Sequence, residues 1–371
     1  MVASNAMTST PLNSKLGMES EPNKSSTSRT IQCSSPSKLI LSGEHAVLYN
    51  SPALSMAVDL KTNCKLKQTQ SDTTQFTLNL NDFGLKKNFS LVEWQVQTQQ
   101  IEQRFQKFQH DQLKIDDVLS SPFDLILICL WVFNQHHQIT TANWLISIQS
   151  EVPIGRGLGS SAAVIVTILS GLLKLHTLPD SNEILLDLAK QVESYQHGRS
   201  SGLDPATLIY GGLLKYQIDQ PIQRLPSPPP LSAWLIDTGA PQSHTGECVQ
   251  TVKQQHQHNT PLWQDFKEVV AQIEQTWLQQ DNEQLKIAIK RNHNLLCEIG
   301  VVPNKVKQFI QELDATLSSA SKVCGAGSVL GENAGIVLCL ADQAPTELCQ
   351  LYGYAFWPLK LQSQGVHCVL D

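Results

Sequence analysis

The sequence predicts a protein of mixed helices and strands, organised in about two domains. Its 371 residues exceed the usual length of one domain. Residues 144–149 alternate like a half-buried strand, whereas residues 162–175 have the composition of a buried helix. Closely spaced prolines within residues 221–230 cannot continue a helix or a central strand. We therefore expect an N-terminal domain over residues 31–225 and a C-terminal domain over residues 226–371.

Seven strands and seven helices are expected from apolar patterning along the chain. Strands are expected at residues 38–41, 57–69, 75–80, 144–149, 233–236, 335–340 and 366–370. Helices are expected at residues 93–117, 122–133, 162–175, 184–198, 262–278, 283–299 and 346–352. Residues 93–117 are polar and rich in Gln, which is typical of a surface helix, whereas residues 122–133 have the composition of a buried one.

The first thirty residues, 1–30, are rich in Ser, Thr and Asn and have few apolar side chains. Such a segment buries too little apolar surface to offset the entropy lost on ordering, so we expect a disordered tail. It lacks the apolar centre of a secretory signal, and no apolar run in the chain reaches the ~18–20 residues of a membrane span. The sequence therefore predicts a cytoplasmic protein that does not enter a membrane.

Charge and cysteine usage narrow the class of ligand. The formal net charge is −6 and there is no long basic block, which argues against nucleic acid or an anionic membrane as the main partner. The nine cysteines are odd in number and none has CxxC spacing, so we expect reduced thiols without a zinc site or disulfides. A small molecule bound by local charges is the expected ligand.

A glycine-rich run connects a predicted strand to a predicted helix. Residues 153–163 read PIGRGLGSSAA, with three alternating glycines followed by two serines. A loop of this kind exposes backbone N–H groups at the positive end of a helix dipole, which favours a bound phosphate. The Walker pattern GxxxxGK[ST] is absent, so the loop is not that of a P-loop NTPase. A tight turn before a core helix is the alternative interpretation.

Two carboxylates and a lysine could complete a phosphoryl-transfer site. Glu193 lies near the end of a predicted helix and Asp204 lies on the loop that follows it, so both can converge on one site. Glu193 with a serine of the glycine run would suffice for Mg²⁺, leaving Asp204 to orient or deprotonate an attacking hydroxyl. A lysine such as Lys38 beside Asp204 would stabilise negative charge at the reacting oxygen. Taken singly, each carboxylate is better explained as a solvated surface acid, and the lysine as an ordinary residue at a strand edge.

Together these stretches resemble the motifs of the GHMP kinases, which act on galactose, homoserine, mevalonate or phosphomevalonate. Residues 35–48 are similar to the first motif, residues 153–163 to the second, PxxxGLGSSAA, and residues 322–327 to the start of the third. The resemblance spans residues 31–371. It implies an α+β fold in which an N-terminal domain like ribosomal protein S5 domain 2 joins a ferredoxin-like C-terminal domain, with the active site in the cleft between them.

Finer detail indicates the substrate. The run GEHAV at residues 43–47, and the spacing of residues 193–204, resemble members that phosphorylate mevalonate. The resemblance implies transfer of phosphate from ATP to the C5 hydroxyl of (R)-mevalonate in isoprenoid biosynthesis, with Mg²⁺ as cofactor and a homodimer as one arrangement that the family adopts. A phosphomevalonate kinase or another small-alcohol kinase is the alternative. A non-catalytic sensor is a remote one, because such a protein would be expected to lose the Lys, Glu or Asp that this chain keeps.

The resemblance also implies a role for each matched residue. Asp204 and Lys38 would be catalytic, with Asp204 acting on the C5 hydroxyl and Lys38 stabilising the transferred phosphoryl group. Glu44 and His45 would bind mevalonate together with these two residues.

The metal and nucleotide roles fall on the helix and the glycine run. Glu193 and Ser161 would bind Mg²⁺. The ATP phosphates would lie against Gly155, Arg156, Gly157, Leu158, Gly159, Ser160, Ser161 and Ala162.

The third motif departs from the family pattern. It commonly reads GAGGGG, but residues 325–330 read GAGSVL. Val329 and Leu330 cannot adopt a positive φ cheaply, so we expect the loop to follow a different path beyond Gly327.

Overall fold

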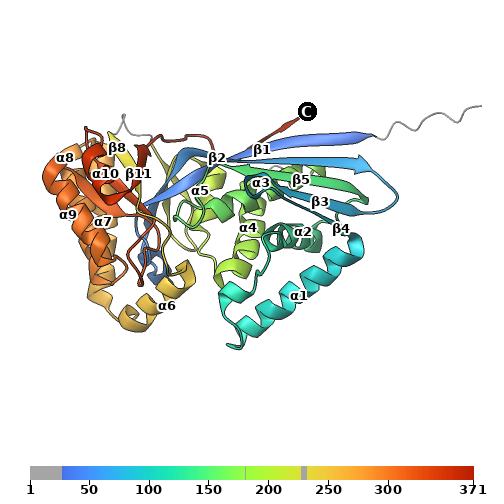
Figure 1. Cartoon of the computed structure of the whole chain (residues 1–371), viewed down its shortest axis with the longest axis horizontal. Helices are drawn as coiled ribbons and strands as arrows, with labels where there is room; N and C mark the ends of the chain where they lie inside the picture. The colour runs from blue at the N-terminus through green and yellow to red at the C-terminus, as the bar shows by residue number, and fades with distance from the viewer. Residues whose placement is uncertain (1–26, 180, 227–231) are drawn as a thin grey trace, which may run out of the picture.

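The computed structural model describes residues 27–179, 181–226 and 232–371. Within these residues the strands form two sheets with helices packed against them (Figure 1). The larger sheet contains β1 (Ser28–Ser42), β2 (Ala53–Gln70), β3 (Gln75–Leu80), β4 (Leu85–Ser90), β5 (Ala142–Ser150), β6 (Leu213–Tyr216), β7 (Gln223–Leu225) and β12 (His367–Leu370). The smaller sheet contains β8 (Ala233–Asp237), β9 (Ala320–Val323), β10 (Ile336–Leu340) and β11 (Ala355–Pro358).

The order of strands shows how distant segments meet. The larger sheet runs β12-β1-β2-β5-β3-β4, with β6 paired to β2 and β7 to β6, and its one parallel pair among the described strands is β3 with β5. The smaller sheet runs β11-β8-β10-β9 and is antiparallel throughout. Because β12 pairs with β1, the chain ends on the sheet where it began.

Most helices pack with the sheet of their own half, and α7 (Thr260–Gln279) of the second half also contacts β1 and β2. The helices packed with the larger sheet are α1 (Leu91–Gln109), α2 (Asp124–His136), α3 (Ser160–Leu175), α4 (Asn182–His197) and α5 (Leu203–Tyr210). Those of the other half are α6 (Thr245–His256), α7 (Thr260–Gln279), α8 (Asn282–Glu298), α9 (Asn304–Leu317) and α10 (Thr346–Tyr352). Figure 1 shows α1, α2 and α4 together on one side of the long strands. Helix α3 lies close to the sheet because Gly171 has no side chain there: a Cβ would lie 2.5 Å from Leu66 Cδ1.

The predicted elements are largely confirmed. Each long amphipathic or apolar run that predicts a helix forms one, with ends shifted by a few residues; residues 93–117 end earlier, at Gln109. The additional helices α5, α6 and α9 were not predicted. Asp204 therefore lies in the first turn of α5 and not on a loop. The expectation of a disordered tail is wrong for residues 28–30, which pair with β2; residues 1–26 lie outside the described residues, as do residues 227–231 of the proline-rich segment.

The cysteine prediction is wrong at one pair. Cys33 and Cys368 form a disulfide, because the antiparallel register of β1 and β12 places them directly opposite each other. They are 335 residues apart in sequence, so spacing carried no signal of the bond. The other seven cysteines in the described parts of the chain are free, and six of them are buried.

Two further observations bear on the expected organisation. The division into domains at residue 225 stays a prediction, and the pairing of β12 with β1 shows that the last strand belongs to the N-terminal sheet. Among the residues that the structure describes, none of the helices combines the length and apolarity needed to cross a membrane.

Candidate active site

The glycine run forms the turn between β5 and α3, as its pattern predicts. Gly155, Gly157 and Gly159 have φ values of +68°, +81° and +75°, a region that favours glycine. Gly159 immediately precedes α3, and Ser160 and Ser161 begin the helix. Unpaired backbone N–H groups of this first turn therefore lie where the positive end of the dipole acts on an anion.

Lys38 lies under this loop and forms an ion pair with Asp204. Its Nζ is 3.0 Å from Asp204 Oδ1, and the lysine side chain is 4% exposed against 31% for the aspartate. The backbone N–H of Lys38 donates to the carbonyl of Leu158, 3.0 Å away. A Cβ on Gly159 would lie 2.7 Å from Lys38 Cγ, so only glycine leaves room for the lysine. The loop and the ion pair are thus one packed unit.

Glu193 is the third charged residue of the predicted set, and the structure brings it to the same place. It is buried near the end of α4, and Ser200 Oγ donates a hydrogen bond to its Oε2. Burial and, to a lesser extent, the charge of Asp204 raise the pKa of Glu193 to about 8, against the opposing effects of the Ser200 hydrogen bond and of Lys38. A cation bound beside Glu193 would stabilise the negative charge of the carboxylate, which burial disfavours.

The donor set fits a hard cation that keeps water and phosphate ligands. Glu193 offers carboxylate oxygen and Ser161 offers a hydroxyl at the start of α3, and oxygen is the donor that Mg²⁺ prefers. Within residues 27–179, 181–226 and 232–371, no cluster of three or more His, Cys, Asp or Glu side chains could hold a metal by itself. A site completed by nucleotide phosphates is consistent with both observations.

Glu44 and His45 lie on the turn after β1 and contact the other half of the chain. Lys322 of β9 forms a buried ion pair with Glu44 Oε1. His45 Nε2 is 3.0 Å from the carbonyl oxygen of Ala326, and burial lowers the pKa of this histidine to about 4. Both predicted substrate residues are therefore held by the start of the third motif. Sequence reasoning assigned no role to Lys322, whose only signal was its position just before the glycines.

That the third motif departs from the family's path beyond Gly327 stays a prediction, and the structure shows the path that it takes here. Gly325 and Gly327 have positive φ, whereas Val329 and Leu330 do not. The backbone N–H of Ser328 donates to the carbonyl of Val301, 2.8 Å away, and Ser328 Oγ donates to the carbonyl of Leu330 at 2.6 Å. The loop thus turns into the C-terminal half after its second glycine.

The side chain of Arg156, within the glycine run, forms an ion pair with the smaller sheet. Its Nε is 2.8 and 2.9 Å from the two carboxylate oxygens of Asp237, at the end of β8. The side chain therefore ties the loop to the smaller sheet, which leaves the backbone of Arg156 as the part available to an anion.

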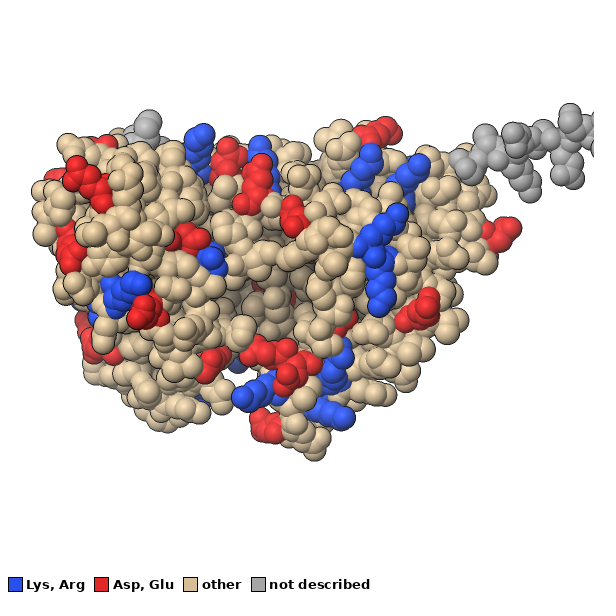
Figure 2. All heavy atoms as spheres, viewed as in Figure 1, with Lys and Arg blue, Asp and Glu red and all other residues tan. Residues whose placement is uncertain are grey.

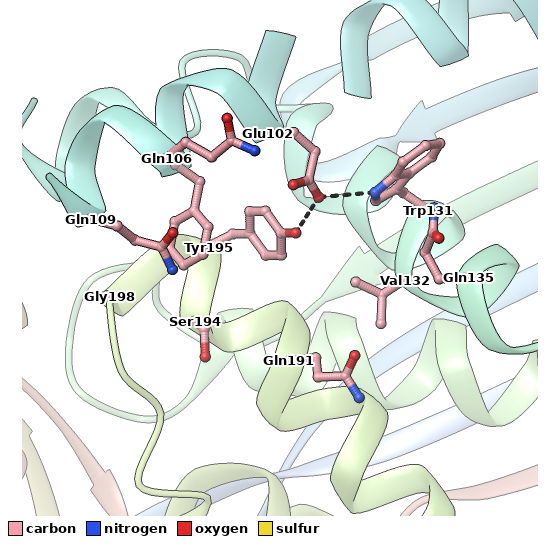
Figure 3. Close-up of a pocket in the computed structure, with 11 residues that line it drawn as sticks. Glu102, Gln106, Gln109, Trp131, Val132, Gln135, Gln191, Ser194, Tyr195 and Gly198 are labelled. Carbon is pink, nitrogen blue, oxygen red and sulfur yellow. Dashed lines mark hydrogen bonds between the residues drawn. The ribbon is translucent and has the colours of Figure 1, made fainter. Parts of the chain in front are cut away.

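A separate surface pocket lies between α1, α2 and α4 (Figure 3). Glu102 of α1 accepts hydrogen bonds from Trp131 Nε1 of α2, at 2.9 Å, and from Tyr195 Oη of α4. None of the predicted site residues lines this pocket. Its hydrogen bonds fix α4, and with it Glu193, against the neighbouring helices.

On the face shown in Figure 2, the surface is hollowed between the two halves of the molecule. Lys and Arg are scattered among Asp and Glu on this face and form no continuous basic patch. This distribution agrees with the expectation of a small ligand.

The fold and this site are those of a small-molecule kinase. Residues 124–212 match the family model of the GHMP kinases N terminal domain. Its relatives include mevalonate kinases: that of Thermococcus sibiricus is 26% identical over 332 residues, covering 86% of this chain and 91% of the relative. That of Pyrococcus abyssi is 28% identical, covering 81% and 86%, and that of Arabidopsis thaliana is 27% identical, covering 80% and 88%.

Solved structures confirm the predicted two-domain α+β fold. The Methanococcus jannaschii mevalonate kinase has a TM-score of 0.71 at 20% identity, covering 92% of this chain and 99% of that one. Lactococcus lactis galactokinase, complexed with galactose, has a TM-score of 0.72 at 13% identity, covering 91% and 95%. At these low identities the structural similarity establishes the fold but does not identify the substrate. Evidence on the substrate comes from the sequence relatives and from the site itself.

Proposed function

We propose that the protein is a mevalonate kinase, which transfers the γ-phosphoryl group of ATP to the C5 hydroxyl of (R)-mevalonate and yields 5-phosphomevalonate and ADP. The observation that carries this proposal is the Lys38–Asp204 ion pair beneath a glycine loop. The similarity to mevalonate kinases over most of the chain supports the choice of substrate.

Asp204 and Lys38 divide the work at the reacting hydroxyl. Asp204 is the more exposed partner, so its free oxygen can accept the hydrogen of the C5 hydroxyl and aim the oxygen at the γ-phosphorus. Lys38 holds the carboxylate in place and lends positive charge where negative charge develops on the transferred group. The proton that leaves the hydroxyl passes to Asp204 as the O–P bond forms.

The nucleotide is bound by backbone groups and a metal. The N–H groups of residues 155–162 would surround the phosphates at the start of α3, where the helix dipole favours negative charge. Glu193 and Ser161 would hold Mg²⁺, which when bound neutralises charge on the ATP phosphates. Glu44 and His45 would line the mevalonate pocket.

A substrate panel tests the proposal. ADP release is measured with mevalonate, phosphomevalonate, galactose and homoserine in turn, with an alcohol-free reaction as the background. We expect kcat/KM for mevalonate to exceed that for every other alcohol. The altered third motif makes phosphomevalonate the chief competitor, so a preference for it, or for a sugar, would replace the proposed substrate. ATP binding without ADP release on any alcohol would indicate a sensor.

A further inference from the structure

Lys322 is a charged side chain with no exposure to solvent, and it links the two halves of the molecule. Lys322 is 0% exposed and Glu44 is 2% exposed. The ammonium group binds Glu44 Oε1 and also donates to the carbonyl of Ile40, 3.4 Å away. Burying two charges is costly unless the pair is well placed, so a pair at this position calls for a role beyond stability.

The turn that Lys322 holds contains an unusual concentration of unpartnered polar atoms. Ser42 Oγ, Glu44 Oε2 and His45 Nδ1 are buried and have no hydrogen-bond partner among the described residues. A buried polar atom that is left without a partner destabilises the folded protein. Three such atoms within four consecutive residues indicate a site that a ligand completes.

The chemistry of two of these atoms can be assigned. The carbonyl of Ala326 can only accept, so Nε2 of His45 must carry the hydrogen. Burial keeps the ring neutral by lowering its pKa to about 4, which leaves Nδ1 as a bare acceptor. Glu44 Oε2 is also an acceptor, because a carboxylate has no hydrogen to donate. Two buried acceptors on consecutive residues favour a ligand that donates a hydrogen bond and disfavour an anion.

We propose that Lys322 is a positioning residue of the substrate pocket, which fixes Glu44 so that its Oε2 and Nδ1 of His45 together accept a hydrogen bond from the tertiary C3 hydroxyl of mevalonate. This inference rests on the proposed function. Mevalonate offers two hydroxyls, of which the C5 hydroxyl belongs to Asp204. Its carboxylate cannot approach a pair of acceptors, so the C3 hydroxyl is the group that remains.

A substrate analogue tests, without any mutation, whether the pocket recognises the C3 hydroxyl of mevalonate. Initial rates of the wild-type protein with ATP are compared for mevalonate and for 5-hydroxy-3-methylpentanoate, which lacks only the C3 hydroxyl. We expect kcat/KM to be at least ~10²-fold lower for the analogue, because a site built to bind a hydroxyl leaves buried groups unpaired without it. Equal values would overturn the inference. No turnover of mevalonate itself would instead be a failure of the proposed function.

A matched pair of variants tests the role of Lys322. Lys322→Met removes the ammonium group, whereas Lys215→Met removes a lysine that also bridges the two halves, with its Nζ 2.7 Å from Glu274 Oε2. We expect the preference for mevalonate over the analogue to fall at least ~10-fold in Lys322→Met and to stay unchanged in Lys215→Met. A merely structural role would lower both rates alike and keep the ratio, which would contradict the inference.

The design also covers a variant that does not fold. If Lys322→Met yields no folded protein, Lys322→Arg carries the test, because its larger planar head group displaces the Glu44 carboxylate while keeping the charge. The expected result is again a smaller preference for mevalonate over the analogue, with the KM for ATP unchanged. A wild-type ratio in a folded Lys322→Arg protein would overturn the proposal.

Discussion

The ion pair between Lys38 and Asp204 joins an almost fully buried ammonium group to a carboxylate that is still partly open to solvent. Such a pair combines a fixed orientation with access to substrate. Asp204 gains its direction from two sources, the first turn of α5 and the lysine of β1. Because both α5 and Lys38 hold the Asp204 side chain, a substitution that keeps its shape should leave its position largely unchanged. Such a substitution therefore tests the chemical role of the carboxylate.

Asp204→Asn keeps the shape of the side chain and removes its capacity to take a proton. We expect kcat with mevalonate to fall by at least ~10²-fold, the lower range for loss of a positioned base, while the KM for ATP changes little. Steady-state ADP release provides the measurement. Asp59→Asn is the control, since Asp59 pairs with Lys61 on the surface, 3.5 Å away, and its loss should leave kcat unchanged. Turnover of Asp204→Asn near the control value would remove Asp204 from the mechanism.

His293 on α8 predicts a dependence of stability on pH. Burial, with a smaller effect of Lys322 and Lys307, lowers the pKa of His293 from 6.5 to about 4. Between these values the unfolded chain binds a proton that the folded chain does not, so stability falls as the pH drops from 6.5 toward 4. From pH 7 to pH 5 this histidine should cost roughly 1–2 kcal/mol of unfolding free energy.

Urea unfolding at pH 7 and pH 5 measures this cost. His293→Gln should lose less stability on acidification than the wild type by about that amount, while other buried histidines act equally in both proteins. Equal losses in the two proteins would show that His293 does not titrate in this range.

At the residue scale, the sequence indicated which side chains converge but not what holds them. Lys38, Glu193 and Asp204 stood out because each lies within or close to a stretch that resembles a family motif. Lys322 did not, because its partner Glu44 is 278 residues away and a buried ion pair leaves no periodic signal. The Cys33–Cys368 bond was missed for the same reason.

At the scale of elements, the junction between β5 and α3 shows why three glycines alternate in the loop. The positive φ values turn the chain so that α3 begins directly above Lys38. The loop is also held from the other side, since a Cβ on Gly335 would lie 2.7 Å from the carbonyl oxygen of Arg156. The glycine loop is therefore fixed by contacts to both halves of the chain.

Gly159→Ala tests this packing. The new methyl group would collide with the side chain of Lys38. The alanine would also have to adopt a φ of +75°, which a residue with a Cβ disfavours. The conformational cost alone is about 1–2 kcal/mol, and displacement of Lys38 should lower kcat at least ~10-fold. Thermal unfolding and ADP release are measured side by side.

Gly84→Ala is the matched control for Gly159→Ala. Gly84 has φ of +62°, but nothing lies within 4 Å of a Cβ at that position. It should show the conformational cost without the loss of kcat. Normal turnover in Gly159→Ala would mean that the loop and Lys38 move independently.

Helices with a clear apolar stripe were predictable from the sequence, whereas helices without one were not. Helix α7 carries an apolar stripe over Thr260–Gln279 and was expected close to its actual ends. Helix α6 is rich in Gln and buries only Cys248 and Val252 along its length, so it has no apolar stripe that would predict a helix. Helix α5 has eight residues and begins just after Gly202, which reads locally as a turn.

At the scale of the whole molecule, one hydrophobic cluster joins the two sheets, and a second lies between the larger sheet and its own helices. A single cluster of buried side chains includes Leu39, Leu41 and Met56 from the long strands together with Leu235 and Val337 from the smaller sheet. The sequence could indicate two units, since the prolines mark a break between them. It could not indicate that their cores merge, because that depends on how the sheets meet in space.

A shared core predicts that the two halves unfold in one transition. Separate domains with separate cores unfold in steps, whereas here loss of either sheet would expose apolar residues of the other. Buried tryptophans report on both halves, with Trp94 and Trp144 in the first and Trp263 and Trp277 in the second. A double variant, Trp263→Phe with Trp277→Phe, enriches the fluorescence signal from the first half and can be compared with far-UV circular dichroism of the whole chain. We expect the two signals to give the same midpoint and the calorimetric and van't Hoff enthalpies to agree. Two midpoints several degrees apart would show that the halves are thermodynamically independent and that the cleft between them is held by the surface contacts alone.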